Sequence, residues 1–371
     1  MKFTCEKVRL VSAISVASRT VAQKSAIPAL EGILLKAGEF KVMLTGYNLE
    51  TGITVGLDAD IAEPGACIMP ARLFFDIIRK LPDDTVSVQV DESYKVSIRG
   101  GISSFTITAT SADDYPELPD VESDKGIRIP QTELREMISG TIFSASENFA
   151  RPVHTGCLFE IEDESVTVVA VDGYRLALRR YFPEESLQRK LRFVAPAAAL
   201  KECEKILTDD TDDAVIYLGT KHILFKMGDA TLVCRILDGE FLDWRKVLPQ
   251  DNPIRVTANV SQITDSIERV GLIISEKLKS PVRCRLGHNE VDFRTTSTIG
   301  EAHDVCPIAG DGKDLEIGFN CKYLLDALRA VPTEEVSLEL INGLSPIVLN
   351  PCDGSGKYSY MVLPVRLKAG E

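Results

Sequence analysis

One passage recurs three times along this chain, at a period of about 125 residues. Each copy starts with a proline or asparagine after an apolar residue, continues as a short amphipathic stretch, and ends in strand-like alternation before a proline. The copies cover residues 69–116, 195–249 and 319–364. A repeat of this length is as long as a domain, so the sequence predicts three copies of one fold, at 1–122, 127–250 and 253–371.

Apolar periodicity predicts an α+β fold in which each domain has two helices packed on antiparallel sheets. In the first domain we expect helices at 6–19, with Val8, Val11 and Ile14 about one turn apart, and at 72–81, where Leu73 and four other apolar residues share a face. The corresponding apolar positions in the later helices are Leu134, Met137 and Ile138; Leu200, Cys203 and Leu207; Ile263, Ile267 and Val270; and Leu324, Leu325, Leu328 and Val331.

Strand-like alternation fills much of the remaining sequence, as at 86–90 and 336–340. Asp172 and Gly173 lie between two such segments, 166–171 and 175–179. Because this dipeptide favours the positive φ angles of a tight turn, it predicts a β-hairpin.

Composition is that of a globular protein, with 44% hydrophobic and 26% charged residues among 371. No apolar run approaches the roughly 20 residues of a membrane-spanning helix. The N-terminal residues lack the apolar core of a signal peptide, so we expect a cytoplasmic protein. Nine scattered cysteines without a Cys-x-x-Cys pair indicate reduced thiols. The net charge of −13 argues against nucleic-acid binding by bulk attraction, but it leaves room for a local basic surface.

Motifs for catalysis or metal binding are weak. Residues 354–357 are similar to a phosphate-binding loop, but Pro351 and Tyr358 stand where that motif needs Gly and Ser or Thr, so a turn is expected. The acidic run 209–213 lacks the Gly and distal Glu of a calcium loop. Four possible zinc ligands lie in strand-like segments and are better explained as buried cysteines and surface histidines: Cys284, His288, His303 and Cys306. We predict no cofactor and no metal site.

Two further features remain. Lys and Arg lie on the outward helix faces of all three domains; solubility explains any one of them, but the repetition favours a common role. The end of the chain, 360–367, is mostly apolar. It fits a final strand, and any exposed part would suit a partner's apolar side chains.

Over its whole length the chain resembles the bacterial DNA polymerase III beta subunit family, the sliding clamps. The order and spacing of five segments carry the resemblance: 114–116 (DYP), 171–177 (VDGYRLA), 237–245 (LDGEFLDWR), 317–320 (IGFN) and 363–367 (LPVRL).

The resemblance implies a DNA-clamp fold and a head-to-tail homodimer, in which six domains close into a ring lined by twelve helices. Twelve helices packed about 9 Å apart enclose a hole about 24 Å wide, enough for duplex DNA. The implied function is that of a non-enzymatic processivity factor that encircles duplex DNA and tethers the polymerase catalytic subunit. A clamp loader and other proteins with clamp-binding motifs are the further implied partners, and no membrane is involved.

The resemblance also implies site residues. DNA would be faced by Lys24, Arg79, Lys80, Arg151, Lys201, Lys205, Lys277 and Lys279. Ring closure would bring Phe105 and Ile107 of one subunit against Leu272 and Ile273 of the other. A partner-peptide pocket, with Arg175 and Arg366 at its rim, would be formed by His154, Thr155, Val171, Gly173, Tyr174, Arg175, Leu176, Leu242, Lys246, Val247, Met361, Val362, Leu363, Pro364, Val365 and Arg366.

Three pocket positions depart from the usual family pattern: His154 replaces Leu, Leu242 replaces Pro and Lys246 replaces Arg. They affect the expected peptide preference. Two other functions stay open at the level of the sequence: a hydrolase that uses Asp172 with a histidine such as His154, and an interaction scaffold unrelated to DNA.

Overall fold

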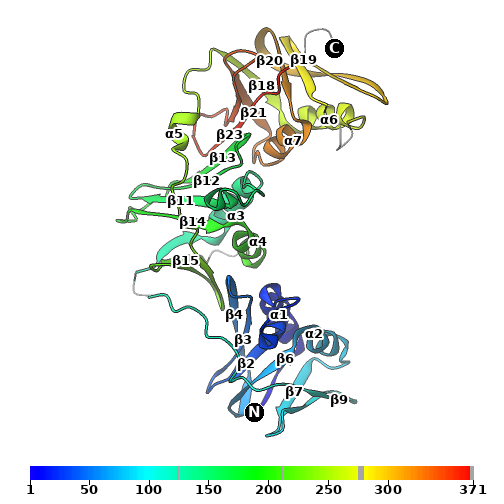
Figure 1. Ribbon diagram of the computed structural model, residues 1–371, viewed down its shortest axis with the longest axis vertical. Coiled ribbons are helices and arrows are strands. Elements are labelled where there is room, and N and C mark those ends of the chain that lie inside the picture. The colour runs from blue at the N-terminus through cyan, green and yellow to red at the C-terminus, as the bar shows by residue number, and fades with distance from the viewer. Residues whose placement is uncertain (123–124, 210–211, 275–279, 368–371) are drawn as a thin grey trace. The chain divides into compact units, whose positions relative to one another are not determined.

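The computed structural model describes residues 1–122, 125–209, 212–274 and 280–367. They form two compact units, residues 1–134 with 198–236 and residues 135–197 with 237–371. Figure 1 shows the elements of both units. Paired helices and antiparallel sheets confirm the predicted α+β class.

The first unit contains two antiparallel sheets. The smaller has the strand order β5-β1-β7-β8-β9: β1 (Lys2–Glu6), β5 (Asp60–Glu63), β7 (Thr85–Val90), β8 (Lys95–Gly100) and β9 (Ser103–Thr108). The larger has the order β10-β15-β16-β17-β4-β3-β2-β6: β2 (Gly32–Ala37), β3 (Lys41–Tyr47), β4 (Thr51–Asp58), β6 (Gly65–Pro70), β10 (Ile127–Pro130), β15 (Asp213–Leu218), β16 (His222–Met227) and β17 (Ala230–Arg235). Antiparallel pairing of β17 with β4 makes the larger sheet continuous across the first predicted domain boundary.

The second unit is built on a sheet in the order β14-β11-β12-β13-β23-β22-β21-β18-β20-β19. Its strands are β11 (Gly156–Glu162), β12 (Ser165–Val171), β13 (Arg175–Tyr181), β14 (Leu191–Pro196), β18 (Ile254–Asn259), β19 (Val282–Ser297), β20 (Gly300–Phe319), β21 (Glu335–Leu340), β22 (Ile347–Asn350) and β23 (Tyr358–Val362). The last strand, β23, pairs antiparallel with β13, and Leu176 lies opposite Met361. This pairing holds the C-terminal segment against the predicted hairpin.

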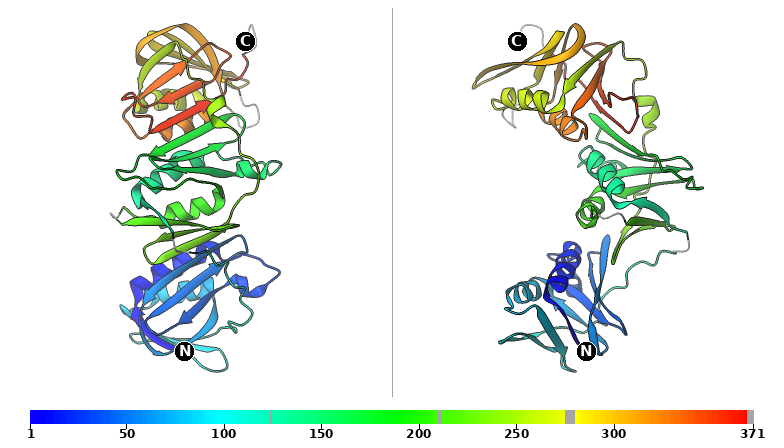
Figure 2. Two further views of the ribbon diagram at one scale, coloured as in Figure 1. Left: turned by 90° about the vertical axis from the view of Figure 1, so that its left-hand side faces the viewer. Right: turned by 180° about the vertical axis from the view of Figure 1, so that it is seen from behind.

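The helices are α1 (Lys7–Ala17), α2 (Ala71–Lys80), α3 (Gln131–Ile142), α4 (Ala197–Ile206), α5 (Trp244–Val247), α6 (Val260–Gly271) and α7 (Cys321–Arg329). Figures 1 and 2 show α1 beside α2 in the first unit, and α6 beside α7 in the second. Asn259 and Asn320 cap α6 and α7, because each side-chain oxygen accepts a hydrogen bond from a backbone N–H in the first turn. Among the described residues, no helix combines the length and the apolar character needed to cross a bilayer.

The predicted helix positions are confirmed, but three of the side chains assigned to their apolar faces are not buried. Val8 is 73% exposed, Leu73 is 48% exposed, and Val11 is half-buried. Helix α1 buries the predicted Ile14 together with Leu10, Ala13 and Ala17. A single sequence shows which residues share a helical face, but the packing partners decide how much of that face is covered.

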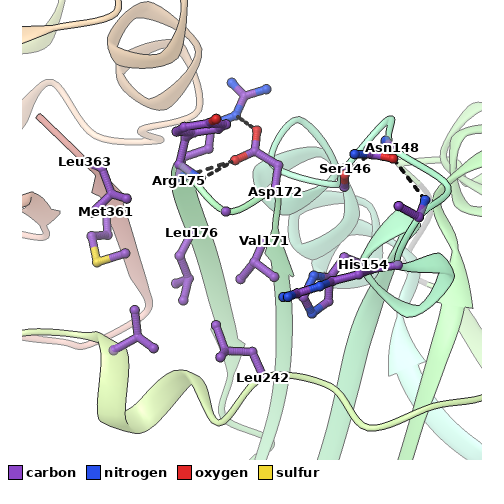
Figure 3. A pocket seen from close by; sticks show the side chains of 15 residues that line it. Ser146, Asn148, His154, Val171, Asp172, Arg175, Leu176, Leu242, Met361 and Leu363 are labelled. Carbon is purple, nitrogen blue, oxygen red and sulfur yellow. Dashed lines mark hydrogen bonds and ion pairs between the residues drawn. The ribbon is translucent and has the colours of Figure 1, made fainter. Parts of the chain in front are cut away.

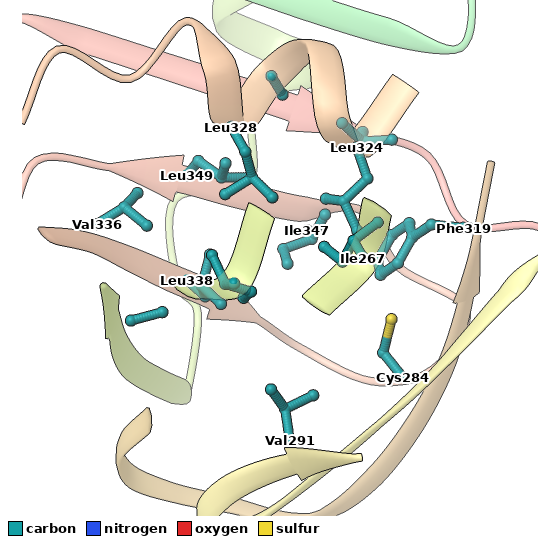
Figure 4. Close-up of a cluster of buried hydrophobic side chains, with 14 of the residues drawn as sticks. Ile267, Cys284, Val291, Phe319, Leu324, Leu328, Val336, Leu338, Ile347 and Leu349 are labelled. Carbon is teal, nitrogen blue, oxygen red and sulfur yellow. The ribbon is translucent and has the colours of Figure 1, made fainter. Parts of the chain in front are cut away.

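Buried aliphatic and aromatic side chains between the sheet and α6 and α7 form the main core of the second unit (Figure 4). Cys284 points into this core, where burial raises the pKa of its thiol. Among residues 1–122, 125–209, 212–274 and 280–367, no group of three or more His, Cys, Asp or Glu side chains is arranged to hold a metal ion.

Candidate functional site

An apolar recess in the second unit, here called the hairpin pocket, has a volume of about 580 Å³. Four segments that are far apart in the sequence form it: the loop before β11, the β12–β13 hairpin, α5 with the residues before it, and the end of β23. Its lining residues are Ser146, Asn148, Ala150, Arg151, His154, Val171, Asp172, Gly173, Tyr174, Arg175, Leu176, Leu242, Val247, Met361 and Leu363.

The floor of the pocket is apolar. Val171, Leu176 and Met361 are nearly buried and belong to one cluster of packed side chains. Figure 3 shows them pointing, together with Leu242, into the same space. Leu242 remains 40% exposed at the rim. Such a surface suits the apolar side chains of a partner, since their burial removes hydrocarbon from water at about 25 cal/mol per Å².

The hairpin turn positions this floor. β12 and β13 form the predicted hairpin, with Val171 opposite Leu176. Of the two residues expected at positive φ, only Gly173 adopts it, at +93°. Asp172 closes the turn: its Oδ1 atom accepts hydrogen bonds from the backbone N–H groups of Tyr174 (2.9 Å) and Arg175 (3.1 Å). The carbonyl of Tyr174 then accepts a hydrogen bond from the N–H of Leu363 (2.8 Å). The turn therefore holds the C-terminal segment at the edge of the pocket.

Arg175 was expected at the rim, and the structure places it in a partly buried ion-pair network. Its Nε atom lies 2.8 Å from an oxygen of Asp172, and its Nη1 atom lies 2.6 Å from an oxygen of Asp326. Its guanidinium also stacks on the ring of Tyr323, 4.4 Å from the centroid, and its side chain is only 10% exposed. Because both carboxylates already bind it, Arg175 acts as a brace between β13 and α7 and is not a free cation for a partner.

His154 forms one wall of the pocket. Its ring packs edge-to-face against Phe241, with 5.4 Å between the ring centroids. Burial, followed by the charge of Arg151, lowers the pKa of His154 below its usual value. The imidazole is therefore neutral at neutral pH, which keeps this wall compatible with an apolar ligand.

The geometry does not support a hydrolytic pair formed by Asp172 and His154. The hairpin backbone and Arg175 occupy both carboxylate oxygens of Asp172. In Figure 3 the carboxylate points toward Arg175 and away from His154. A carboxylate that assists a histidine base has to accept a hydrogen bond from its ring, and no such bond is made here.

Ten of the sixteen residues expected for a peptide pocket line the hairpin pocket. The other six lie outside this lining: Thr155, Lys246, Val362, Pro364, Val365 and Arg366. Thr155 donates a hydrogen bond to the carbonyl of Pro152, and Lys246 pairs with Asp243. Val362 is buried because its side chain points to the opposite side of β23 from Met361.

Five lining residues were not assigned to the pocket from the sequence: Ser146, Asn148, Ala150, Arg151 and Asp172. Four of them come from the loop before β11, and Arg151 of this loop had been assigned to DNA instead. A loop of polar residues has no periodicity that predicts which side chains meet a distant hairpin, so only the folded chain reveals this wall. Asp172 was recognised as a turn residue, and its place in the pocket follows from that turn.

The candidate DNA-facing residues are exposed where the structure describes them. Lys24 lies between two short 3₁₀ helices, and Arg151 lies before β11. Arg79 and Lys80 end α2, and Arg79 pairs with Asp76 at 3.3 Å. On α4, Lys205 pairs with Glu202 at 2.8 Å, and Glu202 also binds Arg19 at 3.2 Å. Lys277 and Lys279 lie outside the described residues.

The candidate interface residues lie at surfaces of their own units. β9 is an edge strand of its sheet, and Phe105 on it is 40% exposed. Ile107 on the same strand is half-buried. Leu272, just after α6, is 83% exposed, and Ile273 is half-buried. An unpaired edge strand with exposed apolar residues can pair with a strand of another chain.

Comparison with known proteins covers the whole described fold. Models of the N-terminal, central and C-terminal domains of the DNA polymerase III beta subunit match residues 1–119, 128–243 and 245–366. The beta sliding clamp of Staphylococcus epidermidis is 30% identical over 381 residues, 99% of each chain, and that of Staphylococcus aureus is 29% identical over 378 residues, again 99% of each chain.

Solved structures agree. A DNA polymerase III beta subunit from Eubacterium rectale is 34% identical with a TM-score of 0.93, and the DNA polymerase sliding clamp of Bacillus subtilis is 29% identical with a TM-score of 0.94. In both cases the match covers 99% of this chain and 100% of the other. These matches confirm the three clamp domains that the repeat predicted. The chain therefore belongs to the DNA polymerase III beta subunit family, the bacterial sliding clamps.

Proposed function

We propose that this protein is the sliding clamp of a bacterial DNA polymerase III and acts as its processivity factor. The main observation that supports this proposal is that three consecutive clamp domains of one family account for nearly the whole chain. A clamp of this kind acts on DNA with a polymerase as its partner. We expect it in the bacterial cytoplasm, where that DNA is.

The proposed assembly is a head-to-tail homodimer. Edge strand β9, with Phe105 and Ile107, would meet the end of α6 near Leu272 and Ile273 of a second copy. A heterologous contact of this kind gives a finite assembly only if the ring closes. Exposed cations such as Lys24, Lys80 and Lys201 would then keep duplex DNA centred without binding it tightly, since screened attraction of this kind depends little on sequence.

The hairpin pocket is the proposed docking site for partner peptides. Its apolar floor, neutral His154 wall and braced turn suit the alternate apolar side chains of an extended segment. The proposed occupants are segments of the polymerase catalytic subunit, of the clamp loader and of other clamp-binding proteins. Because they share one pocket, these partners would compete.

Topological retention on DNA is the decisive test. The labelled protein is incubated with nicked circular DNA, a bacterial clamp loader and ATP, and the DNA is then cut once or left intact. A ring is expected to stay on the circle and to be lost on linearisation within minutes. Retention that is indifferent to cutting would show ordinary surface binding and would contradict the proposal. A well-studied clamp loaded in parallel confirms that the loader works, so absence of retention would count against the proposal too.

The ring contact has its own test. Ile273→Asp is expected to give a folded monomer, because it places a charge at the proposed contact. Analytical ultracentrifugation measures the mass, and circular dichroism confirms the fold. Leu344→Asp, the same kind of change at an exposed apolar residue elsewhere in the same unit, serves as the control. A dimer of unchanged affinity in the Ile273 variant would contradict the assigned contact.

A further inference from the structure

A second recess lies in the same unit and has no role in the function proposed above. It has a volume of about 380 Å³ and is called here the tryptophan pocket. Its lining includes Arg180, Trp244, Arg245, Leu248, Asn350 and Ser359. Its walls carry two guanidinium groups, those of Arg180 and Arg245, and several neutral polar groups.

Trp244 is the centre of this pocket, and both arginines lie against its ring. The guanidinium carbon of Arg245 is 4.2 Å from the ring centroid, and that of Arg180 is 5.4 Å away. The nearly buried Glu160 fixes the arrangement: it accepts hydrogen bonds from the Trp244 indole N–H (3.0 Å) and from Arg245 (2.9 Å). These groups are therefore held in place before any ligand arrives.

Positive charge exceeds negative charge at this site. Glu160 faces Arg245 and also Arg192, whose Nε atom is 3.3 Å away, so its charge is already shared between two cations. Within the part of the chain that the structure describes, no carboxylate lies within 4 Å of the guanidinium of Arg180. Its Nη1 atom only donates a long hydrogen bond to the carbonyl of Gly356 (3.3 Å). Burial, and then the charge of Arg245, lower the pKa of Arg180, and the charge of Glu160 only partly offsets them.

The two pockets lie on one face of the same strand. Side chains alternate along β13, so Leu176, Leu178 and Arg180 point to the same side. Leu176 lines the hairpin pocket and Arg180 lines the tryptophan pocket. Between them, Leu178 belongs to the same buried cluster as Trp244 of α5. Helix α5 therefore separates the pockets, with Val247 in one wall and Trp244 in the other.

We propose that the tryptophan pocket binds a carboxylate of the same extended peptide whose apolar side chains occupy the hairpin pocket. Four residues of a strand span about 14 Å, so the acidic residue lies about four positions from the nearest apolar anchor. The guanidinium groups of Arg180 and Arg245 bind it by charge-assisted hydrogen bonds. This inference rests on the peptide-binding role of the hairpin pocket and adds a specificity for acidic flanking residues.

Matched heptapeptides test it with the intact protein. The probes are acetylated and amidated Leu-Ser-Leu-Ser-Ser-Ser-Glu, the reversed order Glu-Ser-Ser-Ser-Leu-Ser-Leu, and the same two peptides with Gln in place of Glu. Alternate leucines suit an extended chain, and the two orders cover both binding directions. Because the chain has one tryptophan, 5-fluorotryptophan labelling gives a single ¹⁹F resonance from Trp244. The methyl resonance of Met361 reports on the hairpin pocket.

In one of the two orders, the Glu peptide is expected to bind about tenfold more tightly than its Gln counterpart, the gain typical of a hydrogen bond between charged groups. It should also shift the Trp244 resonance, whereas the Gln peptide should shift mainly Met361. In Arg180→Gln the Glu-to-Gln affinity ratio should fall below about twofold. Arg192→Gln is the control, because it removes an exposed cation that also pairs with Glu160 but does not line the pocket.

Each remaining outcome contradicts a defined part of the proposal. Equal affinity of the Glu and Gln peptides in both orders would overturn the role of the tryptophan pocket and leave that of the hairpin pocket intact. If no peptide shifts the Met361 resonance, both roles fail. A Trp244 shift caused by the oligonucleotide (dT)₁₂, and by none of the peptides, would assign the pocket to phosphate and overturn the peptide proposal.

Discussion

The hairpin pocket and the candidate DNA-facing cations are built in opposite ways. Four distant chain segments form the pocket, and its key groups are buried or braced, as Leu176 and Arg175 show. The cations lie exposed on loops and on helices α2 and α4, and two of them, Arg79 and Lys205, are paired with carboxylates one helical turn away. The hairpin pocket depends on a few indispensable contacts. The candidate DNA-facing surface depends on many weak contacts that can replace one another.

The largest effect is expected at Arg175. Arg175→Ala leaves Asp172 and Asp326 partly buried without their common cation, and should reduce the free energy of unfolding of the second unit by about 3 kcal/mol. Thermal unfolding followed by circular dichroism measures the change. Arg285→Ala, which breaks an exposed pair with Asp314, should cost less than about 0.5 kcal/mol. Similar losses of unfolding free energy in the two variants would contradict the role of Arg175 as a brace.

The next effect concerns binding. Leu363→Asp puts a charge on the half-buried lining of the hairpin pocket, and should weaken binding of a polymerase-derived peptide by at least about 30-fold, because an unpaired charge then has to be desolvated. Val365→Asp is the matched control two residues later, at an exposed position outside the lining. Isothermal titration calorimetry measures both. If Val365→Asp proved as harmful as Leu363→Asp, the pocket would extend further along the C-terminal segment than its lining indicates.

A smaller effect is expected with pH. The pKa of His154 is lowered in the folded state, so the unfolded chain binds more protons and stability rises with pH through this range. The equilibrium constant for folding should therefore fall by a few-fold as the pH drops below about 6.5, the unperturbed value for histidine. Peptide affinity should fall by a similar factor at lower pH, where the folded His154 becomes protonated. His154→Gln should remove the pH dependence of binding. Because the pKa of His222 in the other unit is also lowered, the stability profile should keep a residual slope in that variant.

The smallest effects are expected at single cations. Lys24→Ala or Lys201→Ala alone should change retention on DNA by less than about twofold, since screened surface charges contribute little individually. Combining the two with Lys80→Ala should lower the dependence of retention on salt concentration, by up to about 0.9 in the log–log slope for each phosphate that is no longer neutralised. Lys226→Ala, an exposed lysine on β16, is the control. A large effect of one substitution would show that these residues are not interchangeable.

Local sequence patterns were sufficient to predict the helices and strands. They were not sufficient to predict which side chains on those elements are buried. The hairpin at Asp172 and Gly173 could be predicted because turn chemistry is local, and β12 and β13 do pair antiparallel across it. The same kind of reasoning placed Val8 on a buried face, although it is exposed. Periodicity records which side chains share a face, and it contains no information about what packs against that face.

For the hairpin pocket, too, the sequence predicted some features and not others. The resemblance pointed to Leu176, Leu242 and Met361, which do line one recess. It offered no indication that Arg175 is held between Asp172 and Asp326, because that depends on a carboxylate 151 positions away in the sequence. Ion pairs between distant segments form only when the chain brings them together, and no short-range signal encodes them.

The sequence by itself determined the threefold repeat, the α+β class and the turn at Gly173, because period, alternation and φ preference are properties of neighbouring residues. Only the tertiary structure decided which of the expected residues meet at the hairpin pocket and that Arg180 and Arg245 converge on Trp244. Both sites join β13 to residues near 244 and 360, and contacts over such separations arise from sheet pairing and packing in the folded chain.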